Sequence, residues 1–159
     1  MISRGKKFEK QFEQDWRISF PKGVIIRLPD QQSGYFGTSQ NPCDFICYKY
    51  PKMFMLELKS HEGNTFPISC LRQYNKLITY KDKEGLNAGV IIWFIDHDKV
   101  IYAPITTFEK LIKDNKKSLN IVKDTPDKYF YINIPSVKKR TFLNSNYTVL
   151  CGTEDLNER

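Results

Sequence analysis

Residues 41–60 read NPCDFICYKYPKMFMLELKS. Two apolar runs rich in β-branched and aromatic residues flank Tyr50-Pro51, and this pattern predicts an antiparallel β-hairpin. With the turn centred on these two residues and no bulge, Asp44 lies directly opposite Glu57 on the same side of the sheet. Opposed like charges destabilise a sheet, so the pair is costly unless a cation compensates it.

Lys59 adds a third charged group at the same place. It follows Glu57 by two positions, so both side chains point to one face of the strand. Two carboxylates and a lysine that converge on one point can hold a divalent metal and an activated water. The alternative is a salt bridge at a strand end, but buried carboxylates that face each other fit it poorly, because they are expensive without compensation.

The rest of the chain combines helical and extended patterns. Their order is helix, three strands, helix, two strands, helix, strand, which predicts an α/β fold with a mixed β-sheet core flanked by helices. The run 88–95 is apolar on both faces and is therefore expected to be a central strand. The predicted elements are a helix over 4–18 capped by Ser3, strands over 24–28, 44–49 and 52–59, a helix from Ser69 to Gly85, strands over 88–95 and 99–103, a helix over 107–116, and an edge strand over 129–134.

The length of the chain suggests one domain. The 159 residues suffice for a single core, which we expect over 1–150, followed by a polar tail over 151–159. Pro29 to Pro42 is rich in Gln, Ser, Gly and Asn, and predicts a long loop with a functional or partner-contacting role.

The charge balance favours a polyanionic partner without deciding it. The 25 Lys and Arg against 18 Asp and Glu give a net charge of +7. No apolar segment follows the charged N-terminus, and the longest apolar run is too short to span a bilayer, so we expect a cytoplasmic protein with no membrane partner.

The cysteines show no C-x-x-C pair. A zinc site that combines them with His61 or His97 lacks the usual spacing, so we expect reduced, buried thiols in place of a metal centre. The four are Cys43, Cys47, Cys70 and Cys151.

Three ordered segments carry a family resemblance. They are RGKKFE at 4–9, NPCDF at 41–45 and LELKS at 56–60. An acid at the start of a hairpin, followed by Glu-x-Lys at the end of the next strand, resembles the PD-(D/E)XK nuclease superfamily. More narrowly, the segments resemble the RecU-type Holliday junction resolvases and their phage relatives. Gln73 matches the glutamine of the helix after the motif strand, and the resemblance covers roughly 3–112.

The resemblance implies a role for each matching position. Asp44 and Glu57, together with the carbonyl of Leu58, would hold a catalytic Mg²⁺, for which Mn²⁺ can substitute. Lys59 would orient or deprotonate the attacking water, or stabilise charge on the phosphate. Glu9 would complete the metal shell or contact it through water; the alternative is a solvated carboxylate on the helix surface.

The resemblance also implies roles outside this centre. Gln73 would position the water or a ligand, whereas the structural alternative is an exposed helix glutamine. Arg4, Lys6 and Lys7 would contact DNA phosphates, whereas the alternative is an ordinary solvated helix end. Basic charge at a helix N-terminus opposes the helix dipole, which favours the functional explanation.

The implied activity is that of a Mg²⁺-dependent, structure-selective endonuclease. Such an enzyme cuts a four-way DNA junction symmetrically as a homodimer, during recombination and repair in a bacterial or phage-infected cell. Cellular resolvases carry a long stalk before the motif acid, whereas Pro29 to Pro42 spans only fourteen residues, which makes junction selectivity a weaker expectation than nuclease chemistry. The alternatives are a nicking or restriction-type nuclease for other DNA, and a DNA-binding module of the same fold without catalysis.

Overall fold

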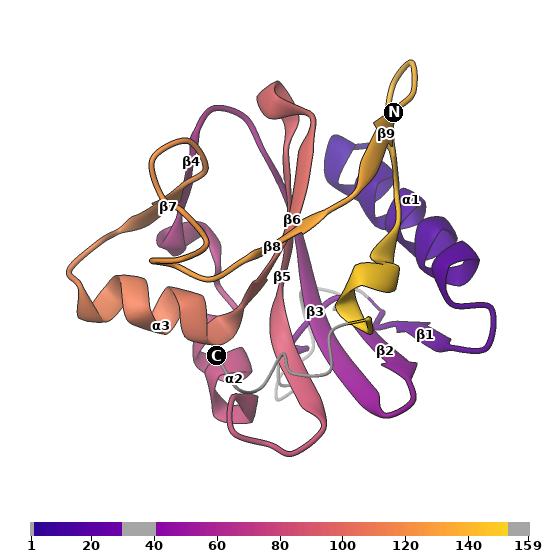
Figure 1. Cartoon of the computed structure of the whole chain (residues 1–159), viewed down its shortest axis with the longest axis horizontal. Coiled ribbons are helices and arrows are strands. Elements are labelled where there is room, and N and C mark those ends of the chain that lie inside the picture. The colour runs from indigo at the N-terminus through magenta and orange to yellow at the C-terminus, as the bar shows by residue number, and fades with distance from the viewer. Residues whose placement is uncertain (1, 30–40, 153–159) are drawn as a thin grey trace, which may run out of the picture.

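A six-stranded β-sheet forms the centre of the molecule in the computed structural model, which describes residues 2–29 and 41–152 (Figure 1). The strand order is β1-β2-β3-β5-β6-β8, in which β3 and β5 run parallel and the other neighbours antiparallel. The predicted mixed α/β class is therefore confirmed. The elements are α1 (Arg4–Ser19), β1 (Val24–Arg27), β2 (Phe45–Lys49), β3 (Lys52–His61), β4 (Thr65–Pro67), α2 (Tyr74–Leu77), β5 (Leu86–Phe94), β6 (Lys99–Pro104), α3 (Ile105–Lys113), β7 (Ser118–Asn120), β8 (Ile132–Ile134), β9 (Ser136–Lys138) and β10 (Leu143–Ser145).

Helix α1 forms where the sequence predicts it. The Ser3 side chain accepts a hydrogen bond from the Lys6 N–H at 3.3 Å and so caps the first turn. Aromatic residues repeat at helical spacing, and Phe8, Phe12 and Trp16 are all buried against the sheet. This face fixes the position of α1, and with it the position of the charged residues of its first two turns.

The sheet has a hydrophobic core on each of its faces, as the apolar character of β5 predicts. Val90 and Ile92 pack into the core beneath α2 and α3, whereas Ile91 packs into the core beneath α1. Figure 1 shows α1 on one side of the sheet and α2 and α3 on the other. Glu57 and Lys59 pair with Val90 and Ile92 in the parallel register, so they lie on the α2 and α3 face.

The segment after β4 differs from the prediction of one helix that begins at Ser69. Ser69 lies inside a single 3₁₀ turn, Ile68–Cys70, and α2 begins only at Tyr74. The break lies at Leu71, which adopts φ −93° and ψ 78°, outside the helical region. Leu71 and Leu77 are nevertheless buried, so this segment still packs against the core.

The helix α3 and the strand β8 are shifted from their predicted limits. The predicted helix over 107–116 begins earlier, at Ile105, and ends at Lys113. The predicted strand over 129–134 is paired only over Ile132–Ile134, at the edge of the sheet, as expected. The further strands β4, β7, β9 and β10 were not predicted, because three residues are too few to show an alternating pattern.

The cysteine prediction is only half correct. All four thiols are free, and Cys43 and Cys47 are buried, but Cys70 is exposed and Cys151 is half-buried. Residues 30–40 of the predicted loop and 153–159 of the predicted tail lie outside the described residues. In the described ranges, no helix has both the length and the apolar character needed to cross a membrane.

Candidate active site

Asp44 and Glu57 meet at the end of the β2–β3 hairpin. The register from Phe45 with Leu56 to Lys49 with Lys52 is the predicted one, and Asp44 directly precedes the first of these pairs, so its side chain lies beside that of Glu57. The Asp44 N–H donates to the Leu56 carbonyl at 3.0 Å, and the Asp44 carbonyl accepts from the Leu28 N–H at 2.8 Å. The backbone of Asp44 is therefore held on both sides, although regular pairing in β2 begins only at the next residue.

The side chains of these residues form one cluster with Lys59. The Asp44 carboxylate accepts a hydrogen bond from the Leu58 N–H at 2.8 Å. Glu57 is 3% exposed, and its Oε1 lies 3.3 Å from the Lys59 Nζ. Its other oxygen, Oε2, is buried and has no hydrogen-bond partner among the described residues. Asp44, Glu57 and Lys59 are thus brought together as the sequence predicts, and we call them the charged triad.

Burial makes the two carboxylates hard to ionise. Burial raises the pKa of Glu57 to about 8, and the charge of Asp44 adds to this effect while Lys59 opposes it. Burial also raises the pKa of Asp44; the hydrogen bond from Leu58 opposes that rise, and the charge of Glu9 adds to it. A cation placed between the two carboxylates would remove most of this cost, because it favours both charged forms.

The carbonyl of Leu58 faces the same opening. In a β-strand, the N–H and C=O of one residue point to the same neighbouring strand. Because the Leu58 N–H donates to Asp44, its carbonyl is directed to the same side of β3, past the point where β2 begins. A third oxygen is therefore available next to the two carboxylates.

The residues of this cluster fit Mg²⁺ or Mn²⁺. Both ions take oxygen ligands, and Mg²⁺ is commonly bound by one or two carboxylates together with waters and substrate phosphates. The unpartnered Glu57 Oε2 is the kind of atom that such an ion would satisfy. No group of three or more His, Cys, Asp or Glu that could hold a metal occurs in the described ranges, so water and substrate would have to complete the shell.

Glu9 lies near the charged triad but is engaged with another residue. Its Oε2 accepts hydrogen bonds from Arg27 Nη2 at 2.9 Å and Nε at 3.2 Å. No role for Arg27 was predicted from the sequence, although it is the one charged residue in the apolar strand β1, where it lies opposite Phe45. The predicted contact of Glu9 with a metal therefore stays a prediction, and Arg27 is the partner that orients its carboxylate.

The other predicted residues are more dispersed. Gln73 immediately precedes α2, and its Oε1 is buried without a partner among the residues described. Lys6 and Lys7 are exposed on the first turn of α1, as phosphate contacts would need to be. Arg4 is also exposed and forms an ion pair with Glu62.

Comparison with known proteins supports the fold assignment. No protein-family model and no curated protein sequence matches the chain. Among solved structures, the fold is similar to that of Hjc, a Holliday junction resolvase from the archaeal hyperthermophile Archaeoglobus fulgidus. The TM-score is 0.52 with 18% sequence identity, over 78% of this chain and 94% of Hjc. The predicted mixed α/β fold, a sheet flanked by helices, is thereby confirmed, whereas membership of the PD-(D/E)XK superfamily and the narrower kinship with RecU-type and phage resolvases stay predictions.

Proposed function

We propose that this protein is a Mg²⁺-dependent, structure-selective DNA endonuclease that cuts four-way junctions. The observation that carries the proposal is the charged triad, in which two carboxylates face each other with one buried oxygen unpartnered. Such a cluster costs stability unless a cation compensates it, because buried carboxylates close to each other resist ionisation. Its occurrence on a fold shared with a junction resolvase points to phosphodiester hydrolysis.

The chemistry divides among the three side chains. Asp44 and Glu57 would hold the ion together with the carbonyl of Leu58. Bound Mg²⁺ supplies a polarised phosphoryl oxygen and a water of lowered pKa. Lys59, whose Nζ lies 3.3 Å from Glu57 Oε1, would orient the attacking water and stabilise negative charge on the phosphate.

The proposed partner is branched DNA. The net charge of +7 favours a polyanion, and Arg4, Lys6 and Lys7 present three cations on one exposed helical turn. A four-way junction has near two-fold symmetry and needs two symmetric cuts, so we propose a C₂ homodimer. Kinship with the RecU-type resolvases is part of this proposal and is supported by the three sequence segments described above.

The test is a cleavage assay on a panel of labelled DNA substrates. A four-way junction, a linear duplex, a flap and a single strand are each incubated with the protein and Mg²⁺. We expect paired symmetric cuts in the junction, and no cutting in EDTA. Asp44→Asn and Lys59→Ala should each lower the cleavage rate by at least about 100-fold while junction binding is retained. Glu13→Gln, which alters a half-buried carboxylate of α1 paired with Arg17, is the matched control.

The outcomes separate the proposal from its alternatives. Cleavage of duplex or single strand in preference to the junction would indicate a nicking or restriction-type nuclease. Junction binding without cleavage under Mg²⁺ or Mn²⁺ would indicate a DNA-binding module without catalysis. An Asp44→Asn protein that cuts as fast as the wild type would exclude the charged triad as the catalytic centre.

A further inference from the structure

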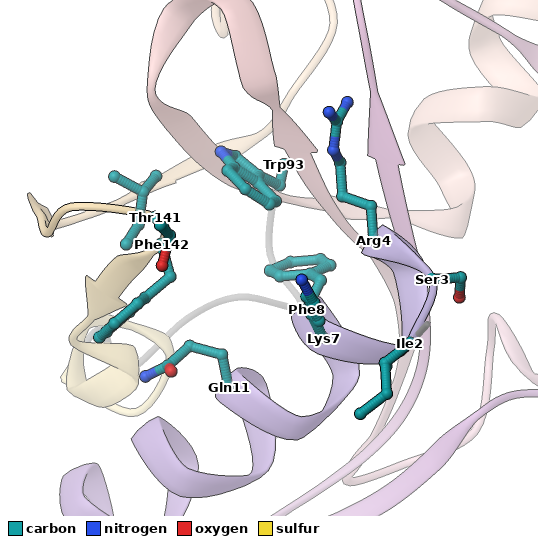
Figure 2. Close-up of a pocket in the computed structure, with 10 residues that line it drawn as sticks. Ile2, Ser3, Arg4, Lys7, Phe8, Gln11, Trp93, Thr141 and Phe142 are labelled. Atoms are coloured by element: carbon teal, nitrogen blue, oxygen red, sulfur yellow. The ribbon is translucent and has the colours of Figure 1, made fainter.

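A pocket of about 390 Å³ lies on the face of the sheet opposite the charged triad. It is formed by the first turns of α1, the end of β5 and the residues that lead into β10 (Figure 2). This volume is within the range of about 300–1,000 Å³ that is usual for ligand pockets. Neither the charged triad nor the proposed metal accounts for it.

Aromatic rings form the walls of this pocket. The Phe8 and Trp93 rings lie 5.7 Å apart with an interplanar angle of 45°, and Figure 2 shows Phe142 across the cavity from Arg4. Phe142 is 38% exposed. Aromatic side chains favour stacked and edge-to-face contacts with other rings. The walls therefore suit a flat ring.

Cations lie at the rim of the same pocket. Arg4 and Lys7 both line it and are exposed. Arg4 is paired with Glu62, but both side chains are more than half exposed, so the pair is weak and a phosphate can replace the carboxylate. Aromatic surfaces beside Arg and Lys are the combination that binds single-stranded nucleic acid, because bases stack while phosphates pair with the cations.

The pocket lies within reach of a DNA strand held at the charged triad. Trp93 pairs with Ser60, which is three residues beyond Glu57 on β3, or about 10 Å along the strand. The triad and the pocket lie on opposite faces of the sheet, so the path between them is longer than this, and at about 3.4 Å per nucleotide it spans at least three nucleotides. Because the pocket is on the other face of the sheet, only a base that has left the stack can enter it.

We propose that this pocket binds one unstacked nucleobase of the DNA substrate, at least three nucleotides from the scissile phosphate. The proposal rests on the proposed nuclease function. It assigns the aromatic walls to base stacking and Arg4 and Lys7 to the adjoining phosphates. A branch point supplies such a base at low cost, because its pairing and stacking are already interrupted. The pocket would thus contribute to the choice of branched over linear DNA.

The first experiment removes the base and the aromatic wall separately and together. Four-way junctions that lack a single base at successive positions around the branch are titrated with protein in Ca²⁺, with fluorescence anisotropy as the readout. We expect one abasic position to raise the Kd of the wild type by about 5- to 150-fold. The Phe142→Ala protein should bind the intact junction more weakly than the wild type does. Removing the base at that position should then raise its Kd little further. Val137→Ala, which alters a 62% exposed side chain on the preceding strand β9, is the control and should keep the full abasic effect.

A second readout does not depend on the junction. An oligonucleotide of fifteen deoxythymidines should quench the fluorescence of Trp93 in the wild type. It should leave the Trp93→Phe protein unaffected, because its remaining Trp16 is 1% exposed. The inference is overturned if the wild type shows no quenching, or if Phe142→Ala responds to abasic junctions as Val137→Ala does. If the junction is cleaved but neither the abasic positions nor Phe142→Ala has an effect, the nuclease function stands and the pocket has no part in it.

Discussion

Replacing Glu57 by glutamine should stabilise the metal-free protein at alkaline pH. The pKa of Glu57 rises from 4.5 to about 8 on folding, mainly through burial. Between these values the folded protein holds a proton that the unfolded chain releases, so the free energy of unfolding falls as the pH rises. Each pH unit is worth at most about 1.4 kcal/mol, which sets a limit of about 5 kcal/mol at pH 9.

The realistic gain is smaller than this limit. Asp44 shares the proton equilibrium, and Lys59 at 3.3 Å offsets part of the cost, so we expect Glu57→Gln to gain about 2–3 kcal/mol at pH 9. That corresponds to a rise in Tm of about 4–12 °C for a chain of this length. At pH 4.5 the two proteins should melt within about 2 °C of each other, because Glu57 is then protonated in the folded state.

The assay is thermal unfolding followed by circular dichroism, in EDTA, at pH 4.5 and pH 9. Glu13→Gln, which alters an exposed pair with Arg17 on α1, is the control and should shift the stability by less than about 0.5 kcal/mol at either pH. Adding Mg²⁺ at 100 times its Kd should stabilise the wild type by about 2.7 kcal/mol and Glu57→Gln by much less. A Glu57→Gln protein no more stable than the wild type at pH 9 would refute the view that these carboxylates are destabilising without a cation.

Three further predictions concern the scaffold and the DNA surface. Asp15→Ala should lower the free energy of unfolding, measured in urea, by about 2–4 kcal/mol. The buried Asp15 carboxylate accepts a hydrogen bond from the Ser145 N–H at 2.9 Å and so ties α1 to β10. A loss below about 1 kcal/mol would show that this bond is dispensable. Gly89→Ala should cost about 2–4 kcal/mol in the same assay, since its Cβ would lie 2.6 Å from the Tyr102 ring, and an unchanged midpoint would contradict the close approach of β5 and β6. Lys6→Ala should weaken junction binding and reduce the slope of log affinity against log salt by about one, whereas an unchanged slope would remove Lys6 from the phosphate contacts.

The hairpin that carries the charged triad could be predicted from sequence because its information is local. Tyr50-Pro51 centres the turn, and the turn sets the register from Phe45–Leu56 to Lys49–Lys52, which brings Asp44 beside Glu57. The central position of β5 could be predicted for a similar reason, because a strand that is apolar on both faces needs cover on both sides.

The features that the sequence did not reveal depend on contacts between distant segments. The Arg27–Glu9 ion pair joins β1 to α1, and neither residue carries a local sign of the other. The pocket beside Trp93 brings together three segments far apart in the chain. The break at Leu71 interrupts an otherwise helical pattern, which shows that burial of a side chain can outweigh local helical preference.

Titration of Mn²⁺ by electron paramagnetic resonance tests the central claim most directly, because it counts bound ions without requiring cleavage. The wild type should bind Mn²⁺ at the charged triad at pH 8, and Mg²⁺ should displace it. Asp44→Asn and Glu57→Gln should each weaken this binding by at least about tenfold. Equal Mn²⁺ binding by all three proteins, or none by the wild type with DNA present, would contradict a metal centre built from these two carboxylates.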